Sequence, residues 1–209
     1  MVVTTPTHID QRERRYTPAG RSNLRMVNGN NGKSKTLVGH AALFDVLSVD
    51  LGGYREKIRL GAFAKSLKRG DDVAALIEHT TGIMVLGRTT AGTLKLEEDH
   101  TGLRAEIALP DTNAGRDLIT LIGRGDISQM SFAFTVRKQE WSEPKGGDPI
   151  RTLLEVDLHD VSPVVFPAYT NTTVGIRALT QWRNGGGKHV GSELEFQRRR
   201  LAAFDTALL

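Results

Sequence analysis

The chain has 209 residues, of which 39% are hydrophobic and 25% charged, the composition of a globular domain with one sizeable core. It contains no cysteine, which excludes disulfides, thiolate metal sites and a cysteine nucleophile. No segment approaches the roughly 18 uninterrupted apolar residues of a membrane helix. The N-terminus has no apolar signal core, so we expect neither membrane insertion nor export. The net charge is +4, but the basic residues are scattered, so we expect no nucleic-acid-binding surface.

Residues 1–34 are polar and rich in Gly and Asn, as expected for a flexible N-terminal arm. From residue 35 the sequence changes to short apolar or alternating runs separated by glycine-containing turns, which predicts β-strands. The predicted strands are residues 36–44, 54–60, 73–79, 84–89, 93–98, 103–109, 127–136 and 151–166.

Two short helices are predicted between these strands. In residues 61–70, Phe63 and Leu67 lie four apart on one helical face and Gly70 ends the helix. Thr112 can cap a second helix over residues 113–122. About nine short strands and two or three helices predict a mainly β (α+β) fold, a closed or nearly closed antiparallel β-barrel with peripheral helices.

The C-terminal segment is predicted to lie apart from a barrel domain of residues 35–180. Three consecutive glycines at 185–187 indicate a flexible linker. Ser192 and Glu195 then form a capping box, and the apolar residues that follow share one helical face. These apolar residues are Leu194, Leu201, Phe204 and Leu208. We therefore expect residues 181–209 to be a linker followed by an amphipathic helix.

The sequence carries no metal or cofactor motif. It has no HExxH, no histidines paired at helical spacing, no Walker loop and no GxGxxG before a helix, so we expect neither a metal nor a cofactor. Among the six histidines, His79 ends an apolar strand, which gives the rigid support that a catalytic base requires. His159 also lies in a strand. A histidine at a strand end is also an ordinary satisfied polar residue, and that interpretation stays open for both.

Serine chemistry is the remaining possibility, and it centres on the segment SQMSF. Ser128 and Ser131 are three residues apart, so on a strand they point to opposite faces. Ser128 shares its face with bulky side chains, which predicts the core side, whereas Ser131 lies on the small, polar face that suits the wall of a cleft. The bulky side chains are Met130, Phe132 and Phe134. On composition alone, both serines can be ordinary strand residues.

Four long motifs occur in order along the chain: GHAALFDVLSVDLGGYREKIRLGAF, IEHTTGIMVLGRT, GDISQMSFAF and LHDVSPVVFPAYTNT. Over residues 36–177 they resemble the tailed-phage prohead proteases, a family that in turn resembles the herpesvirus assemblins. The resemblance implies an assemblin-like β-barrel serine peptidase whose nucleophile lies within a strand.

The resemblance also implies roles for individual residues. His79 matches the general base, and Ser131, in the MSF element, matches the nucleophile, with Ser128 as the second choice. Asp160 occupies the place of the third member of the triad.

Two neighbours of Asp160 are alternatives for the third role. Glu155 and His159 fall on one face of the predicted strand, whereas Asp160 points to the other. Only one of these two faces of the strand can be directed toward the active site.

The implied activity is acyl transfer without a cofactor. The protein would be a serine endopeptidase that cleaves scaffold and major capsid protein precursors, and itself, inside assembling proheads in the host cytoplasm. The resemblance to assemblins also implies a homodimer or higher oligomer. The alternative is a non-catalytic capsid-associated or scaffold protein that keeps the peptidase fold.

Overall fold

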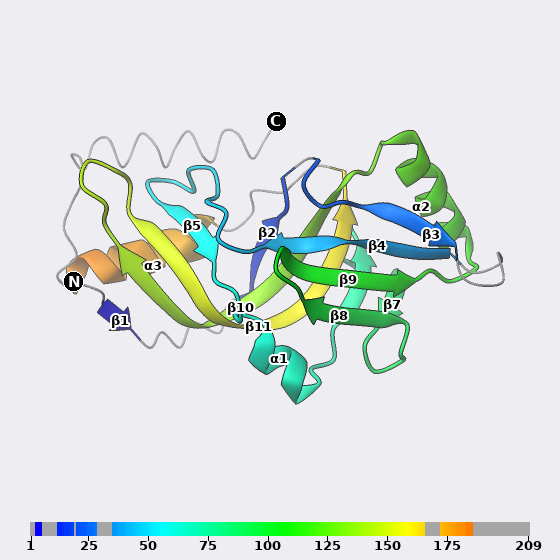
Figure 1. The fold of residues 1–209 in the computed structure, drawn as a ribbon, viewed down its shortest axis with the longest axis horizontal. Helices are drawn as coiled ribbons and strands as arrows, with labels where there is room; N and C mark the ends of the chain where they lie inside the picture. Colours follow the sequence, from blue (N-terminus) through cyan, green and yellow to red (C-terminus); the bar gives the residue numbers. More distant parts are fainter. Residues whose placement is uncertain (1–2, 6–11, 19, 29–34, 166–171, 186–209) are drawn as a thin grey trace.

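The structure, a computed structural model, describes residues 3–5, 12–18, 20–28, 35–165 and 172–185, and places their strands in two sheets (Figure 1). The strands of the larger sheet are β1 (Val3–Thr5), β2 (Glu13–Tyr16), β5 (Arg55–Ile58), β6 (Ala74–Ile77), β7 (Thr80–Arg88), β10 (Gln129–Ser142) and β11 (Ile150–Val164). The strands of the smaller sheet are β3 (Arg25–Asn28), β4 (Lys35–Leu43), β8 (Leu94–Glu98) and β9 (Gly102–Ala108).

The larger sheet is mixed and open. Its order is β1-β10-β11-β6-β7, with β2 also paired to β10 and β5 also paired to β11. β11 runs antiparallel to β10 but parallel to β5 and β6. In the described residues the end strands, β1 and β7, are not paired with each other. The mainly β class with peripheral helices is thus confirmed, whereas the prediction of a closed antiparallel barrel is wrong.

The reason for this difference is that alternation of side chains reveals a strand and its buried face but not its partner. The pairing of β11 with two strands from the first half of the chain, β5 and β6, depends on long connections, which the local pattern does not encode. The smaller sheet, by contrast, is antiparallel throughout, in the order β3-β4-β9-β8.

The hydrophobic core lies against the bulky face of β10, as the sequence predicts. Met130, Phe132 and Phe134 are at most 1% exposed. The Phe132 ring stacks on Phe134 and meets Phe63 edge-on, with ring centroids 4.9 and 5.5 Å apart. Burial of such aromatic side chains supplies much of the stability of a domain.

Two predicted helices are present at the periphery. α1 (Ala64–Arg69) ends at Gly70, whose φ of 73° is the left-handed conformation that favours glycine. α2 (Asn113–Arg124) begins after Thr112, whose side chain accepts a hydrogen bond from the Gly115 N–H at 3.2 Å.

A third helix, α3 (Thr172–Asn184), spans the end of the predicted barrel domain and the start of the predicted linker. It packs on the part of the molecule around Tyr54 and Trp141, and the Trp141 and Trp182 rings stack 5.6 Å apart. A Cβ on Gly175 would lie 1.7 Å from the Tyr54 hydroxyl, so the helix approaches this ring closely because it has glycine there. The predicted helix beyond residue 187 lies outside the described residues.

The segment expected to be a flexible arm contributes β1, β2 and β3. Glu13 of β2 is 1% exposed and binds the guanidinium of Arg151 through two hydrogen bonds of 2.8 and 2.9 Å. Arg15 and Arg151 also bind Glu56 of β5, which closes a buried cluster of four charges. Because these partners are distant in sequence, the polar composition of the segment gave no sign of them.

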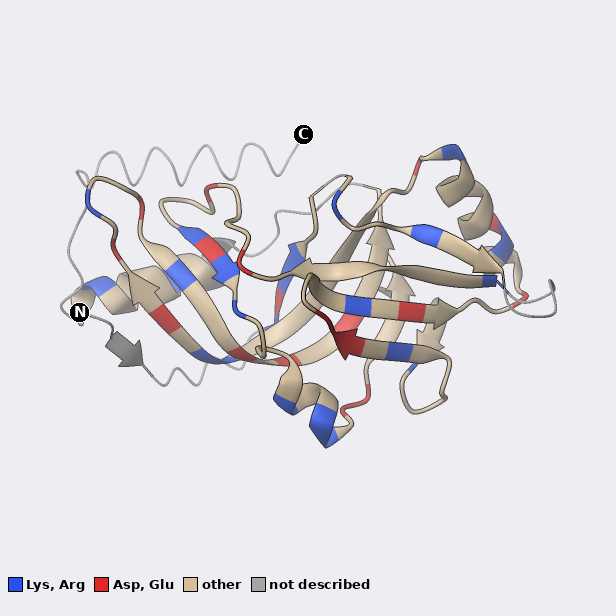
Figure 2. Cartoon of the chain, viewed as in Figure 1, with Lys and Arg blue, Asp and Glu red and all other residues tan. Residues whose placement is uncertain are grey.

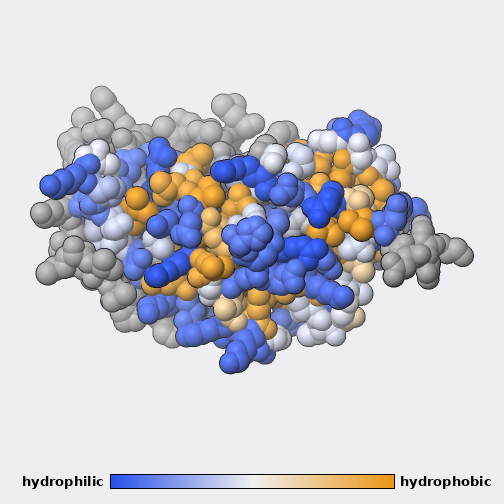
Figure 3. All heavy atoms as spheres, viewed as in Figure 1, coloured by the Kyte–Doolittle hydropathy of each residue, from blue (hydrophilic) through white to orange (hydrophobic). Residues whose placement is uncertain are grey.

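The charges on the surface are distributed over many elements. Figure 2 shows Lys and Arg interspersed with Asp and Glu on most strands, and Arg104 of β9, for example, binds both Glu97 and Glu106. On the face shown in Figure 3, hydrophilic and hydrophobic side chains alternate in small patches. Among the helices that the structure describes, none has both the length and the apolar character to cross a bilayer.

Candidate active site

His79 lies in the two-residue turn that joins β6 to β7. Ile77 and Thr80 are cross-strand partners, so Glu78 and His79 form the turn, with φ angles of 51° and 56°. Hairpin turns of type I′ require positive φ at both central residues, and each non-glycine residue in this region costs roughly 1–3 kcal/mol. The strained turn presents the imidazole beside the end of β11.

Ser131 lies near the start of β10, in the interior of the larger sheet. It is 4% exposed. Its cross-strand partners are Tyr16 of β2 on one side and Ser162 of β11 on the other. The serine is therefore held by a strand that is paired on both edges, and not by the sharp strand-to-helix turn that presents the nucleophile in α/β-hydrolases.

The imidazole of His79 connects Ser131 to Asp160. Its Nε2 lies 2.6 Å from Ser131 Oγ, and its Nδ1 contacts Asp160 Oδ1. The side chains of His79 and Asp160 are only 4% and 9% exposed. A carboxylate, an imidazole and a hydroxyl joined in this order are the arrangement that activates a serine for nucleophilic attack.

The Ser131 hydroxyl has two acceptors within reach but only one proton. Besides His79 Nε2, the backbone carbonyl oxygen of Arg15 lies 2.9 Å from Ser131 Oγ. When His79 is protonated, its Nε2–H donates to Oγ and the hydroxyl donates to Arg15 O, so every group is satisfied. When His79 is neutral, with its proton on Nδ1, the hydroxyl must turn from Arg15 O toward Nε2. The Arg15 carbonyl thus competes with the base for the proton of the serine.

The alternative site residues lie elsewhere. Ser128 precedes β10 and is exposed, and its carbonyl accepts a hydrogen bond from Ser22 Oγ at 2.9 Å. Glu155 Oε2 binds Lys65 Nζ at 2.6 Å. His159 Nε2 lies 2.8 Å from Thr135 Oγ1.

The setting of His159 differs from that of His79. Burial and the nearby charge of Arg12 lower the pKa of His159, which favours its neutral ring. A register shift lies at His159, between the pairs Ala133–Asp160 and Phe134–Leu158, so Asp160, not His159, is the residue that pairs with Ala133 beside the serine. The structure therefore brings His79, Ser131 and Asp160 together and leaves the three alternatives outside their contacts.

Two further groups belong to this site and were not anticipated from the sequence. One is the carbonyl of Arg15, which no side-chain pattern could indicate. The other is Ser162, whose hydroxyl lies 3.3 Å from Asp160 Oδ1. The motif DVSPV contains a signal for it, because residues two apart on a strand share a face.

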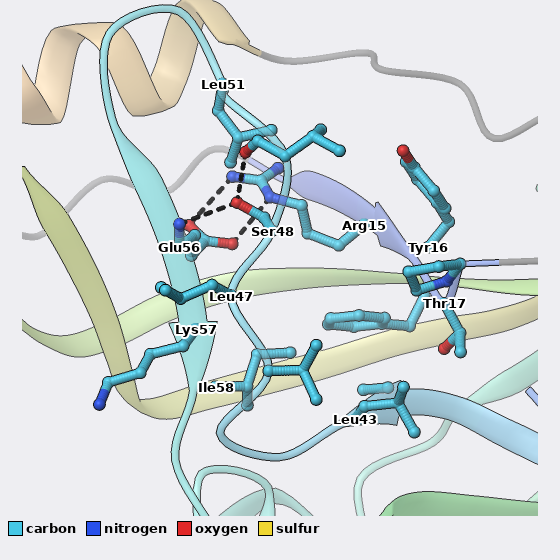
Figure 4. Close-up of a pocket in the computed structure, with 15 residues that line it drawn as sticks. Arg15, Tyr16, Thr17, Leu43, Leu47, Ser48, Leu51, Glu56, Lys57 and Ile58 are labelled. Carbon is cyan, nitrogen blue, oxygen red and sulfur yellow. Dashed lines mark hydrogen bonds and ion pairs between the residues drawn. The ribbon is translucent and has the colours of Figure 1, made fainter. Parts of the chain in front are cut away.

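The described residues hold no cluster of three or more His, Asp or Glu side chains that could bind a metal ion. A pocket lies between β2, the connection from β4 to β5, and β5 itself (Figure 4). It is lined by Arg15, Tyr16, Thr17, Pro18, Ala42, Leu43, Val46, Leu47, Ser48, Val49, Leu51, Glu56, Lys57, Ile58 and Phe132. The side chains of His79, Ser131 and Asp160 are not among them, and Phe132 points to the opposite face of β10 from Ser131. The pocket is therefore separate from the candidate active site.

A sequence profile of the family described as Caudovirus prohead serine protease matches residues 22–184, well over half of the 209 residues. The chain belongs to this family. The family function is that of a capsid-maturation protease, so its substrates are capsid-related. The match begins after β2, so the strand that carries the Arg15 carbonyl lies outside the region that the family profile describes.

Among solved structures, this family member is similar to the bacteriophage T4 capsid assembly protease, gp21, with a TM-score of 0.49 and 13% sequence identity. The likeness covers 75% of this chain and 98% of the T4 chain. No curated protein matches the sequence.

Proposed function

We propose that this protein is a serine endopeptidase with Ser131 as nucleophile, His79 as general base and Asp160 as the carboxylate that orients the base. The observation that carries the proposal is the continuous contact from Asp160 through His79 to Ser131, with Nε2 at 2.6 Å from Oγ. Membership of a serine-protease family supports the same assignment.

The chemistry follows from these contacts. His79 Nε2 takes the hydroxyl proton as Ser131 Oγ attacks the carbonyl carbon of the scissile peptide bond. Asp160 stabilises the imidazolium that forms, and His79 then gives the proton to the leaving amine. Water releases the acyl group in a second step by the same proton transfers in reverse. The low exposure of the three side chains strengthens these electrostatic interactions.

The proposed substrates are the scaffold and major capsid protein precursors, and the protein itself, inside proheads that assemble in the host cytoplasm. We also propose that the enzyme acts as a homodimer or higher oligomer. Specific activity that stays constant over a wide dilution series, with a monomer throughout by light scattering, would contradict this last point.

The test is co-expression with the capsid and scaffold precursors, followed by analysis of their lengths. Wild-type protein should shorten the precursors and react with a fluorophosphonate, whereas Ser131→Ala should do neither. Ser128→Ala is the matched control, since it removes the neighbouring serine of the same strand segment and should behave as wild type. Cleavage by Ser131→Ala but not by Ser128→Ala would move the nucleophile to Ser128. Absence of both reactions in the wild type would leave a structural protein with a peptidase fold.

A further inference from the structure

Ser162 is a buried hydroxyl that contacts both partners of the His79–Asp160 pair. It is 0% exposed and is the cross-strand partner of Ser131. Its Oγ accepts the backbone N–H of His79 at 3.2 Å and lies 3.3 Å from Asp160 Oδ1. It also lies 3.4 Å from His79 Nδ1. No step of the proposed mechanism uses this side chain.

The directions of these hydrogen bonds are determined by the available protons. The backbone N–H of His79 can only donate, so Ser162 Oγ accepts from it. An ionised Asp160 can only accept, so the Ser162 hydroxyl donates to its Oδ1. Because His79 Nδ1–H donates to the same oxygen, the three residues form a closed ring of hydrogen bonds from the backbone of the base to the carboxylate.

This ring of hydrogen bonds holds a turn whose backbone is strained. Glu78 and His79 both have positive φ without being glycine, so the turn relaxes unless other contacts hold it. Besides the contact of His79 Nδ1 with Asp160, three hydrogen bonds tie the turn to the end of β11: His79 N to Ser162 Oγ, Glu78 N to the carbonyl of Pro163 at 3.3 Å, and Val165 N to the Glu78 side chain. Only the contact made by Ser162 reaches the base and the carboxylate together.

We propose that Ser162 is a positioning residue, which holds the strained His79 turn in register with Ser131 and shares the negative charge of Asp160 through a second hydrogen bond. The proposal rests on the proposed function for its catalytic consequence, but the ring itself is a property of the folded protein.

Ser162→Ala removes the ring while leaving the three proposed catalytic side chains in place. The loss of a hydrogen bond to a charged group predicts a fall in kcat of about 10- to 100-fold, with KM changed less than about twofold. Without the hydrogen bond from Ser162, the negative charge of Asp160 stabilises the protonated imidazole more strongly. The acid limb of the pH profile of kcat/KM should therefore move to higher pH. Ser162→Thr, which restores a hydroxyl, should recover the wild-type acid limb.

Ser66 provides a matched control. It is 1% exposed, its Oγ accepts the Leu158 N–H at 3.1 Å, and its hydroxyl donates to Asp71 at 2.6 Å. Ser66 lies in α1, and its partner Leu158 lies in β11, the strand that carries Ser162. Ser66→Ala therefore removes a hydrogen bond between a serine hydroxyl and a residue of β11 without changing the contacts of His79. It should lower stability to a similar degree and leave kcat and the pH profile unchanged. Equal kinetic losses in both variants would show a general effect of stability and would overturn the proposal.

A second readout does not depend on activity. In a Ser131→Ala background, with or without Ser66→Ala, the proton on His79 Nδ1 should give a sharp downfield NMR resonance. In Ser162→Ala, or in Ser162→Cys if the alanine variant does not fold, this resonance should broaden or move upfield. An unchanged resonance would overturn the positioning role. A resonance that responds as expected, together with no precursor cleavage by the protein in which Ser131 is intact, would instead contradict the proposed function alone.

Discussion

At the scale of single residues, the site combines strain and charge. His79 occupies a backbone conformation that L-residues rarely adopt, and its imidazole contacts both Asp160 and Ser131. A strained backbone of this kind persists only where surrounding contacts hold it in place, and such strain is common at functional sites that need a side chain in one fixed orientation. Ser162 contacts the Asp160 end of this chain of residues, and the Arg15 carbonyl contacts its Ser131 end.

Asp160→Asn should lower kcat by on the order of 10³- to 10⁴-fold, because the neutral amide no longer stabilises the imidazolium and favours the wrong tautomer. The loss should be comparable to or smaller than that of Ser131→Ala. The measurement is steady-state cleavage of a peptide substrate, with circular dichroism to verify the fold.

Glu155→Gln is the control for this variant. Glu155 lies on the same strand and is the rival carboxylate, but its side chain binds Lys65. Its removal should leave kcat unchanged. Loss of activity in Glu155→Gln with none in Asp160→Asn would transfer the role to Glu155.

At the scale of elements, the sequence predicts what is local. Most of the strands from β4 to β11 and the helices α1 and α2 are close to their predicted ranges, because alternation, turn glycines and caps act within a few residues. β10 runs six residues beyond its predicted end at residue 136, and β7 begins four residues before its predicted start at residue 84. The strands β1, β2 and β3 and the helix α3 were missed, and the contacts of β2 with Arg151 and of α3 with Tyr54 join segments far apart in the chain. The same holds for the candidate site. The motifs predicted its three side chains, whereas the Arg15 carbonyl lies beside Ser131 because β2 pairs with β10, which the sequence did not reveal.

The turn between β8 and β9 offers a test of electrostatics at this scale. Asp99 accepts the N–H groups of Thr101 and Gly102 and lies 2.8 Å from His40 Nε2 of β4. Burial opposes its ionisation, but these hydrogen bonds outweigh burial and lower the pKa of Asp99 from 3.8 to about 2. Its folded-state pKa is below the unfolded value, so its contribution to stability is complete above the unfolded value and is lost as the pH falls through the folded one.

We therefore expect Asp99→Asn to be less stable than the wild type at about pH 5, with a difference that shrinks between about pH 4 and pH 2. Urea unfolding at several pH values measures this difference. Glu97→Gln, which changes a more exposed carboxylate of the neighbouring strand, should show no such pH dependence. A difference that is constant with pH would contradict the assignment.

At the scale of the whole molecule, a buried charge cluster joins segments from both halves of the chain. Glu13 of β2 lies between Arg151 of β11 and Arg15, and Glu56 of β5 completes the set. Burial opposes the ionisation of Glu13, but the charges and hydrogen bonds of Arg151 and Arg15 hold its pKa below its usual value. The N-terminal segment is thereby fixed to the sheet that carries the candidate active site.

Glu13→Gln should destabilise the protein by about 3–5 kcal/mol, because it leaves buried positive charge without its partner. The measurement is the free energy of unfolding in urea. Asp72→Asn, which breaks the exposed pair with Arg88, is the control and should have little effect. Equal effects of the two variants would mean that the cluster adds nothing beyond a surface ion pair.

The C-terminal segment provides a second test at this scale. Residues 188–209 lie outside the described residues, but their sequence predicts an amphipathic helix too short to be stable alone. We expect this helix to dock on the scaffold or capsid precursor and so bring the protease into the shell. Deletion of residues 188–209 should preserve peptide cleavage and reduce the amount of protein in purified proheads. Loss of peptide cleavage or of folding would instead assign the helix to the enzyme itself.

The charge cluster also sets a limit on how the chain can be shortened. A protease that processes itself removes whatever extended segments its own site can reach, and the ends of the chain are the usual targets. A cut before Glu13 leaves the four charges complete, whereas a cut after it removes one carboxylate and leaves Glu56 as the one acidic partner of two buried guanidinium groups in the cluster. A cut after Arg15 also removes the carbonyl that competes for the hydroxyl proton of Ser131. We therefore expect the fold to tolerate the removal of residues before β2. Removal of residues within β2 should change both the stability of the protein and the reactivity of Ser131.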